Sequence, residues 1–164
     1  MDLKLKNKVV IVTGGGKGIG RGISEVYAEE GARLAILSRP SQATTDFVTE
    51  LKSNGVEVLL IEGDLVAEGY CKEAIAQVVE QYGQIDVLVN NAGINDGVDL
   101  EAGIEAFRKS LNRNIDHVYE LAHYALPYLK ETKGNIVNIT SKVADTGQGG
   151  TSGYAASKGA MNAL

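Results

Sequence analysis

Five short apolar runs alternate with segments of helical periodicity along this 164-residue chain. Each run is rich in Val, Ile or Leu and lacks polar alternation, which predicts strands covered on both faces of a parallel sheet. The predicted strands are 8–13, 32–38, 56–62, 85–90 and 134–140. The predicted helices are 18–30, 42–53, 67–82, 100–110 and 113–131. This alternation, with right-handed crossovers, predicts a doubly wound α/β sheet.

The organisation of the chain indicates a single domain over residues 1–164, because no repeat, low-complexity segment or linker interrupts the alternation. The sequence ends at "YAASKGAMNAL", inside a helical pattern that shows neither a cap nor a breaker. We therefore expect a sequence truncated within the helix after the fifth strand, with the C-terminal part of its fold missing.

Composition and charge narrow the possible partners. A net charge of -5 without runs of like charge argues against nucleic acid and anionic membranes. No apolar run approaches the ~20 residues of a membrane span. The single cysteine, Cys71, forms no internal disulfide, and "MDLKLKNK" lacks the apolar stretch of a signal peptide, so we predict a cytoplasmic protein. His117 and His123 are six positions apart, on different helix faces, so no metal site is predicted.

A glycine cluster follows the first predicted strand in "VVIVTGGGKGIGRG". The P-loop pattern fails because position 11 is Ile and position 18 is Gly, and G-x-G-x-x-G/A fails from every starting glycine. What fits is T-G-x-x-x-G-x-G, formed by Thr13, Gly14, Gly18 and Gly20. Such a loop turns tightly from strand to helix and presents helix N–H groups to a pyrophosphate. A glycine-rich turn without a ligand is the alternative.

The end of the second predicted strand bears on which dinucleotide binds. An acid there would bind the ribose 2′-OH of NAD, whereas a nearby Arg accommodates the 2′-phosphate of NADP. Ser38 occupies that place, Arg39 follows it, and no Asp or Glu lies between Glu30 and Asp46. Lys17 adds a second cation, so the sequence favours NADP(H) over NAD(H). The alternative is that Arg39 is only a solvated surface residue.

A second group of polar residues indicates catalysis. Tyr154 and Lys158 are spaced i and i+4, which places them on one helix face. Ser141 ends the fifth predicted strand, and open α/β sheets bind ligands at strand C-terminal ends. Asn114 and the turn "NNAG" at 90–93 complete the set.

These motifs, in this order and spacing, resemble those of the short-chain dehydrogenase/reductase family and span essentially the whole chain. The resemblance implies a Rossmann-type fold and hydride transfer between NADP(H), or less favourably NAD(H), and a hydroxyl or carbonyl substrate. It implies that Tyr154 exchanges the substrate proton and that Ser141 hydrogen-bonds the reacting oxygen. It also implies that Lys158 favours the phenolate and holds the nicotinamide ribose, and that Asn114 helps to hold a proton-relay water.

The same resemblance, with the glycine loop, gives a set of cofactor-binding residues. They are Thr13, Gly14, Lys17, Gly18, Ile19, Gly20, Ser38, Arg39, Asp64, Leu65, Asn90, Ala92, Gly93, Tyr154 and Lys158. Asp64 resembles the adenine-contacting acid of the family, and a place near a helix N-cap is its alternative. The family resemblance further implies pairing of the helices at 113–131 and from 153 onward in a homodimer or homotetramer.

The substrate prediction rests on the polar, glycine-rich segment "SKVADTGQGGTSGY". Gln148, with Ser141 and Tyr154, offers hydrogen bonds to a polyol, whereas a long acyl or steroid substrate would favour an apolar wall. The chain most resembles the sugar-oxidising branch of the family, in particular L-fucose dehydrogenases, which implies oxidation of a sugar such as L-fucose to its lactone. A 3-oxoacyl-[acyl-carrier-protein] reductase and a cofactor-binding fragment without turnover are the alternatives.

Overall fold

A five-stranded parallel sheet lies at the centre of the protein, in a computed structural model that describes residues 3–164. The strand order is β3-β2-β1-β4-β5, and every neighbouring pair is parallel. The strands are β1 (Val9–Thr13), β2 (Arg33–Ser38), β3 (Val58–Glu62), β4 (Val87–Asn90) and β5 (Asn135–Asn138). The predicted doubly wound sheet is confirmed, and its order reverses between β1 and β4.

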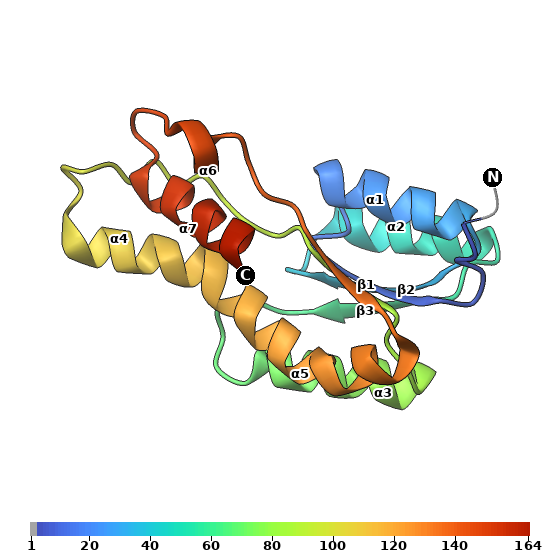
Figure 1. Cartoon of the computed structure of the whole chain (residues 1–164). Helices are drawn as coiled ribbons and strands as arrows, with labels where there is room; N and C mark the ends of the chain where they lie inside the picture. Colours follow the sequence, from blue (N-terminus) through green and yellow to red (C-terminus); the bar gives the residue numbers. More distant parts are fainter. Residues whose placement is uncertain (1–2) are drawn as a thin grey trace.

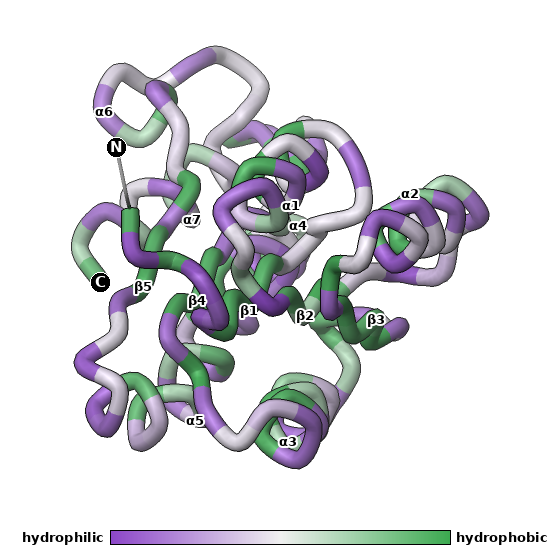
Figure 2. Tube along the Cα trace, turned by 90° about the vertical axis from the view of Figure 1, so that its right-hand side faces the viewer, coloured by the Kyte–Doolittle hydropathy of each residue, from purple (hydrophilic) through white to green (hydrophobic). Residues whose placement is uncertain are grey.

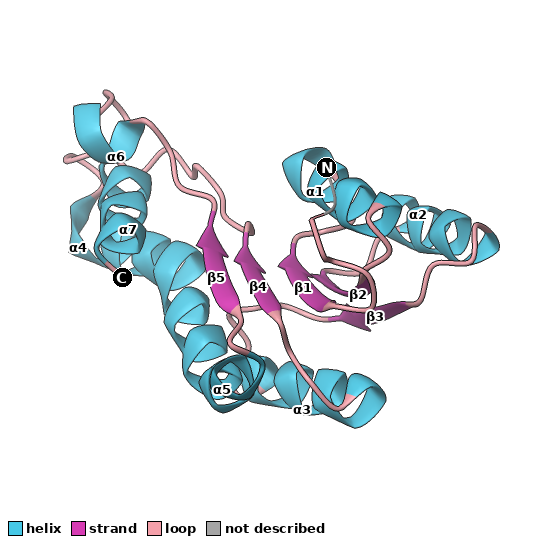
Figure 3. Cartoon of the chain, turned by 45° about the vertical axis from the view of Figure 1, so that its right-hand side comes forward, coloured by secondary structure: helices cyan, strands magenta, loops and turns pink. Residues whose placement is uncertain are grey.

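Helices form a layer on each face of the sheet (Figure 1). α1 (Gly18–Glu29) and α2 (Gln42–Ser53) lie on one face, and α3 (Tyr70–Tyr82) and α5 (His117–Thr132) lie on the other. The remaining helices pack against one another beside β5 (Figure 3): α4 (Gly103–Leu111), the π-helical turn η1 (Asn112–Asp116), α6 (Val143–Thr146) and α7 (Ser152–Ala163). This group carries Tyr154 and Lys158.

The alternation of side chains along β1 divides the core into two apolar clusters. Val9 and Ile11 belong to the cluster on the α3 and α5 side, and Val10 and Val12 to the cluster on the other side. Successive side chains of a strand point to opposite faces, so an unbroken run of β-branched residues suits a strand with helices on both sides. The central strands accordingly form the most hydrophobic part of the trace (Figure 2).

The prediction of strands covered on both faces is wrong for β5. Asn135, Ile136 and Val137 are exposed, with Ile136 at 38%. Among residues 3–164, β5 pairs with β4 alone. On one face the reason is position: α1 and α2 lie over the other strands and do not extend to this edge (Figure 3).

The helix boundaries also differ from the prediction at several places, and the helix expected from residue 100 begins at Gly103. The helices expected at 100–110 and 113–131 follow one another without a break, because η1 joins α4 to α5. In a π turn the backbone hydrogen bonds span five residues instead of four, so the helix continues with one extra residue. The segment "SLNRNID" is largely polar, and for that reason the sequence predicts a helix end there. The helix expected at 67 begins at Tyr70, after Gly69 adopts a left-handed conformation at φ 79°.

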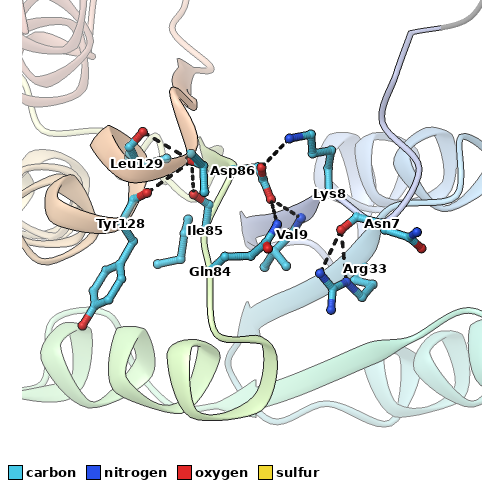
Figure 4. Close-up of polar contacts among 10 residues, drawn as sticks. Asn7, Lys8, Val9, Arg33, Gln84, Ile85, Asp86, Tyr128 and Leu129 are labelled. Carbon is cyan, nitrogen blue, oxygen red and sulfur yellow. Dashed lines mark hydrogen bonds and ion pairs between the residues drawn. The ribbon is translucent and has the colours of Figure 1, made fainter.

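A buried carboxylate ties the N-terminal ends of β1 and β4 together (Figure 4). Asp86 accepts hydrogen bonds from the Val9 backbone N–H at 2.8 Å, from Lys8 Nζ at 2.8 Å and from Gln84 Nε2 at 2.6 Å. Burial raises the pKa of Asp86, but these hydrogen bonds outweigh it and hold the pKa below its usual value. The network lies at the opposite end of the strands from the residues of catalytic interest.

Two further sequence expectations concern features outside the sheet. Within residues 3–164, no helix has both the length and the apolar character that a bilayer crossing requires. The first two residues of "MDLKLKNK", the segment used to argue against a signal peptide, lie outside the described residues.

Candidate active site

The loops that follow β1 and β4 are joined at the point where the strand order reverses. Thr13 Oγ1 accepts hydrogen bonds from the backbone N–H groups of Asn91 and Ala92, both at 2.9 Å. Asn91 Nδ2 donates to the Thr13 carbonyl at 2.8 Å. Open α/β sheets bind ligands at this switch point, outside the carboxyl ends of the strands. Thr13 therefore fixes the two walls of a potential binding site.

The glycine loop turns the chain from β1 into α1. Gly18 begins α1 at φ 55°, a left-handed conformation that favours glycine. A Cβ atom at Gly20 would collide with the Gly14 carbonyl, so only glycine allows the helix to start this close to the strand. Lys17 occupies the N-cap position and makes no side-chain capping hydrogen bond. The open helix N-terminus fits a pyrophosphate, which backbone N–H groups and the helix dipole attract.

A cleft of about 870 Å³ opens at this edge of the sheet. Most of the predicted cofactor residues line it: Gly14, Lys17, Ile19, Gly20, Ser38, Arg39, Asp64, Leu65, Ala92, Gly93, Tyr154 and Lys158. These predicted residues come from the glycine loop, from the ends of β2, β3 and β4, and from α7. Six predicted site residues are not part of this lining: Thr13, Gly18, Asn90, Asn114, Ser141 and Gln148.

Three of those six residues, Thr13, Asn90 and Asn114, form hydrogen bonds behind the cleft wall. Thr13 makes the contacts described above, and Asn90 Nδ2 donates to Asn138 Oδ1 at 3.0 Å, between β4 and β5. Asn114 is fully buried; its Oδ1 accepts from the Ile94 N–H at 2.7 Å, and its Nδ2 donates to the Ile94 carbonyl at 3.0 Å. Asn114 thus holds the segment that follows Gly93.

The two predicted substrate residues apart from Tyr154 lie beyond the cleft lining. Ser141 follows Thr140, which does line the cleft, and the Ser141 carbonyl accepts the Ala144 N–H at 3.0 Å as α6 begins. Gln148 is exposed, in the loop between α6 and α7. The structure therefore brings Ser141 near the cleft and leaves Gln148 on an exposed loop.

Tyr154 and Lys158 lie together on α7, as their spacing predicts. Lys158 Nζ is 5.7 Å from the centre of the Tyr154 ring. The lysine is 2% exposed; its Nζ donates to the Ile139 carbonyl at 2.7 Å and contacts Met161 Sδ at 3.3 Å. Burial lowers the pKa of Lys158. A cation and a phenol thus share one wall of the cleft.

The cleft is more basic than the protein as a whole. Five of its lining residues are cationic and one is acidic, in a chain with a net charge of -5: Lys17, Arg39, Lys109, Arg113 and Lys158 against Asp64. The four ion pairs among residues 3–164 include neither Lys17 nor Arg39. An anionic ligand therefore fits this cleft.

Sequence reasoning missed several lining residues, above all His117. His117 is 2% exposed, and neither ring nitrogen has a hydrogen-bond partner among the described residues. Burial lowers its pKa to about 4. Lys109 and Arg113 also line the cleft, from α4 and η1. Their spacing of four residues was the available signal, because it places both on one helix face.

Comparison with known proteins decides the family. The family model for short chain dehydrogenases matches residues 8–164. The chain belongs to the short-chain dehydrogenase family. An L-fucose dehydrogenase from Rattus norvegicus is 35% identical over 163 residues, which cover 98% of this chain and 59% of the rat protein.

Two solved structures share the fold of this chain. The crystal structure of Cj0485 dehydrogenase is 41% identical with a TM-score of 0.90, over 98% of this chain and 62% of that one. A short-chain dehydrogenase/reductase of unknown function from Caenorhabditis elegans, solved with cofactor, is 33% identical with a TM-score of 0.89. The chain thus spans about three fifths of the length of these relatives.

Proposed function

We propose that the protein is an NADP(H)-dependent oxidoreductase that transfers a hydride between the cofactor and a hydroxyl or carbonyl group of a small polar substrate. The observation that carries the proposal is the pairing of Tyr154 with Lys158 in the same cleft as the glycine loop. Family membership supports the dinucleotide, and the open N-terminus of α1 suits its pyrophosphate.

The proton chemistry follows from the two side chains of α7. When bound, the nicotinamide supplies or accepts the hydride. Proton exchange with a substrate hydroxyl places negative charge on the Tyr154 oxygen, which a nearby cation stabilises. The Lys158 ammonium lies 5.7 Å from the centre of the Tyr154 ring. Tyr154 then takes the proton of a substrate hydroxyl during oxidation and returns it during reduction.

Ser141 and Asn114 have supporting roles in this proposal. Ser141 orients the reacting oxygen from the segment after Thr140, which contributes through position and hydrogen bonding. Asn114 uses its side chain to hold the Ile94 backbone, so its contribution to a proton-relay water would come from the main chain of η1.

Charge at the adenosine end supports NADP(H) rather than NAD(H). Ser38 and Arg39 line the cleft where an acid would bind the ribose 2′-OH, and Lys17 lines it from the glycine loop. None of the ion pairs among residues 3–164 involves the Arg39 guanidinium, which leaves it available. A phosphate dianion at this position gains two cations and meets no carboxylate from this strand.

A sugar such as L-fucose, oxidised to its lactone, is the substrate that we propose for the complete protein. The similarity to a rat L-fucose dehydrogenase supports this class, as does the polar segment between Ser141 and Tyr154. The test is the appearance of reduced nicotinamide with NADP⁺ and a panel of aldoses, with a 3-oxoacyl thioester and NADPH as comparison. Turnover of L-fucose supports the proposal. Turnover of the thioester alone overturns the sugar, and binding of NADPH without turnover on either overturns the enzymatic function.

A further inference from the structure

His117 combines deep burial with unused hydrogen-bonding capacity. The imidazole is 2% exposed, and neither Nδ1 nor Nε2 has a partner among residues 3–164. Buried polar side chains are normally hydrogen-bonded, so two unpartnered nitrogens on one ring need an explanation. His117 lines the cleft, but both of its ring nitrogens are buried, so any partner of theirs is a buried group.

The surroundings of His117 keep the ring neutral near neutral pH. Burial is the main cause of a pKa lowered to about 4, and the positive charge of Lys158 on α7 acts in the same direction. The Arg113 carbonyl, one turn earlier, lies close enough to attract an imidazole N–H although no well-aligned hydrogen bond forms, and it opposes this effect together with the carboxylates of Asp116 and Asp64. A neutral imidazole carries one N–H donor and one nitrogen acceptor.

Lys158 is a buried hydrogen-bond donor with too few strong acceptors. Its ammonium is buried, and both of its hydrogen-bonding partners are neutral: the Ile139 carbonyl at 2.7 Å and the Met161 sulfur at 3.3 Å. No carboxylate pairs with it among the described residues. An ammonium has three donors, and a thioether is a weak acceptor. Lys158 therefore lacks a strong second acceptor, and His117 offers one.

We propose that His117 is a positioning residue: its neutral imidazole accepts a hydrogen bond from a water molecule that the Lys158 ammonium also binds, and so holds this buried cation in place and charged beneath the cleft. The link comes from the chain itself and does not depend on which substrate is used. Its consequence for catalysis rests on the proposed function of Lys158.

The proposal predicts a specific change with pH. Burial already lowers the pKa of Lys158, and an acceptor on the ammonium counteracts this by favouring the charged form. In His117→Leu, Lys158 should lose its proton at lower pH. The alkaline midpoint of NADPH affinity should fall by about one pH unit, the usual size of an environmental shift in folded proteins. His117→Gln, which keeps a donor and an acceptor, should restore most of that shift.

The binding experiment uses the complete protein, with NADPH fluorescence titrated from neutral to alkaline pH. His123→Leu is the matched control, because His123 is exposed on the same helix and should leave the midpoint unchanged. Circular dichroism checks that each variant is folded. A folded His117→Leu protein whose alkaline midpoint equals that of the wild type would overturn the proposal.

A second measurement separates this proposal from the proposed function. The imidazole nitrogen signals of His117 are those that disappear in His117→Leu, and those of His123 are those that disappear in His123→Leu. In cofactor-free protein, Lys158→Met should shift the His117 nitrogen signals and leave those of His123 in place. Unchanged His117 signals overturn the link even if the enzyme turns over. A shift with no cofactor binding leaves the link standing and counts against the proposed function.

Discussion

The backbone at Gly93 lies directly against the ammonium of Lys158. A Cβ atom at position 93 would come within 3.3 Å of Lys158 Nζ and 3.1 Å of Asn114 Oδ1. The absence of a side chain in the turn after β4 therefore allows the lysine of α7 and the asparagine of η1 each to approach this turn closely.

Gly93→Ala should displace the Lys158 ammonium, because Asn114 is held on both sides by Ile94 and cannot move away. The expected result is a loss of NADPH affinity by roughly tenfold, equivalent to the lower end of the 1–3 kcal/mol typical of overpacking. Gly149→Ala is the control, since a Cβ there meets nothing within 4 Å. Equal dissociation constants for the two variants would show that the contact is not limiting.

Arg39→Ala tests the choice of cofactor. Loss of one charge-assisted hydrogen bond, about 1.5 kcal/mol, should weaken NADPH binding by roughly tenfold. NADH binding should change little, because NADH has no 2′-phosphate. Fluorescence titration of both cofactors against both proteins provides the measurement. Tighter binding of NADH than NADPH by the wild type would refute the assignment.

Asp86→Asn tests the buried network at the other end of the sheet. Its hydrogen bonds hold the folded-state pKa of Asp86 below the unfolded value, so their stabilisation is present above the unfolded pKa and is lost as pH falls through the folded one. At neutral pH the variant should lose roughly 1–3 kcal/mol of unfolding free energy, measured in denaturant. The difference from wild type should shrink below about pH 4. Asp145→Asn, at an exposed carboxylate, should show neither effect.

The outer face of α5 tests association of the complete protein. Tyr119 is 63% exposed and stacks on His123 with ring centres 6.3 Å apart, and Leu126, one turn further along the same stripe, is 43% exposed. We expect this stripe to be buried in a homodimer or homotetramer. Tyr119→Glu combined with Leu126→Glu should lower the mass found by light scattering, whereas Leu100→Glu should not. A wild-type monomer at micromolar concentration would contradict the expectation.

The sequence predicted the sheet and most of the cleft because those features are encoded locally. The run of Val and Ile in β1 and the glycines that follow specify a buried strand and a tight turn by themselves. The exposure of Ile136 could not be predicted in this way, because an apolar run looks the same whether a helix covers it or not. The burial of His117 could not be predicted from the local sequence either. It depends on the π turn before it and on α7, which begins more than thirty residues further along the chain.

The central claim is that Tyr154 exchanges the proton of the reacting hydroxyl. Phenylalanine keeps the ring and its packing and removes only the hydroxyl, so Tyr154→Phe in the complete protein should bind NADPH as the wild type does. The decisive measurement is the rate of nicotinamide reduction by wild type and Tyr154→Phe with saturating NADP⁺ and the best sugar of the panel. The account predicts a loss of at least ~10²-fold, the contribution typical of general acid–base catalysis. Near-normal turnover by a folded, NADPH-binding Tyr154→Phe protein would contradict it.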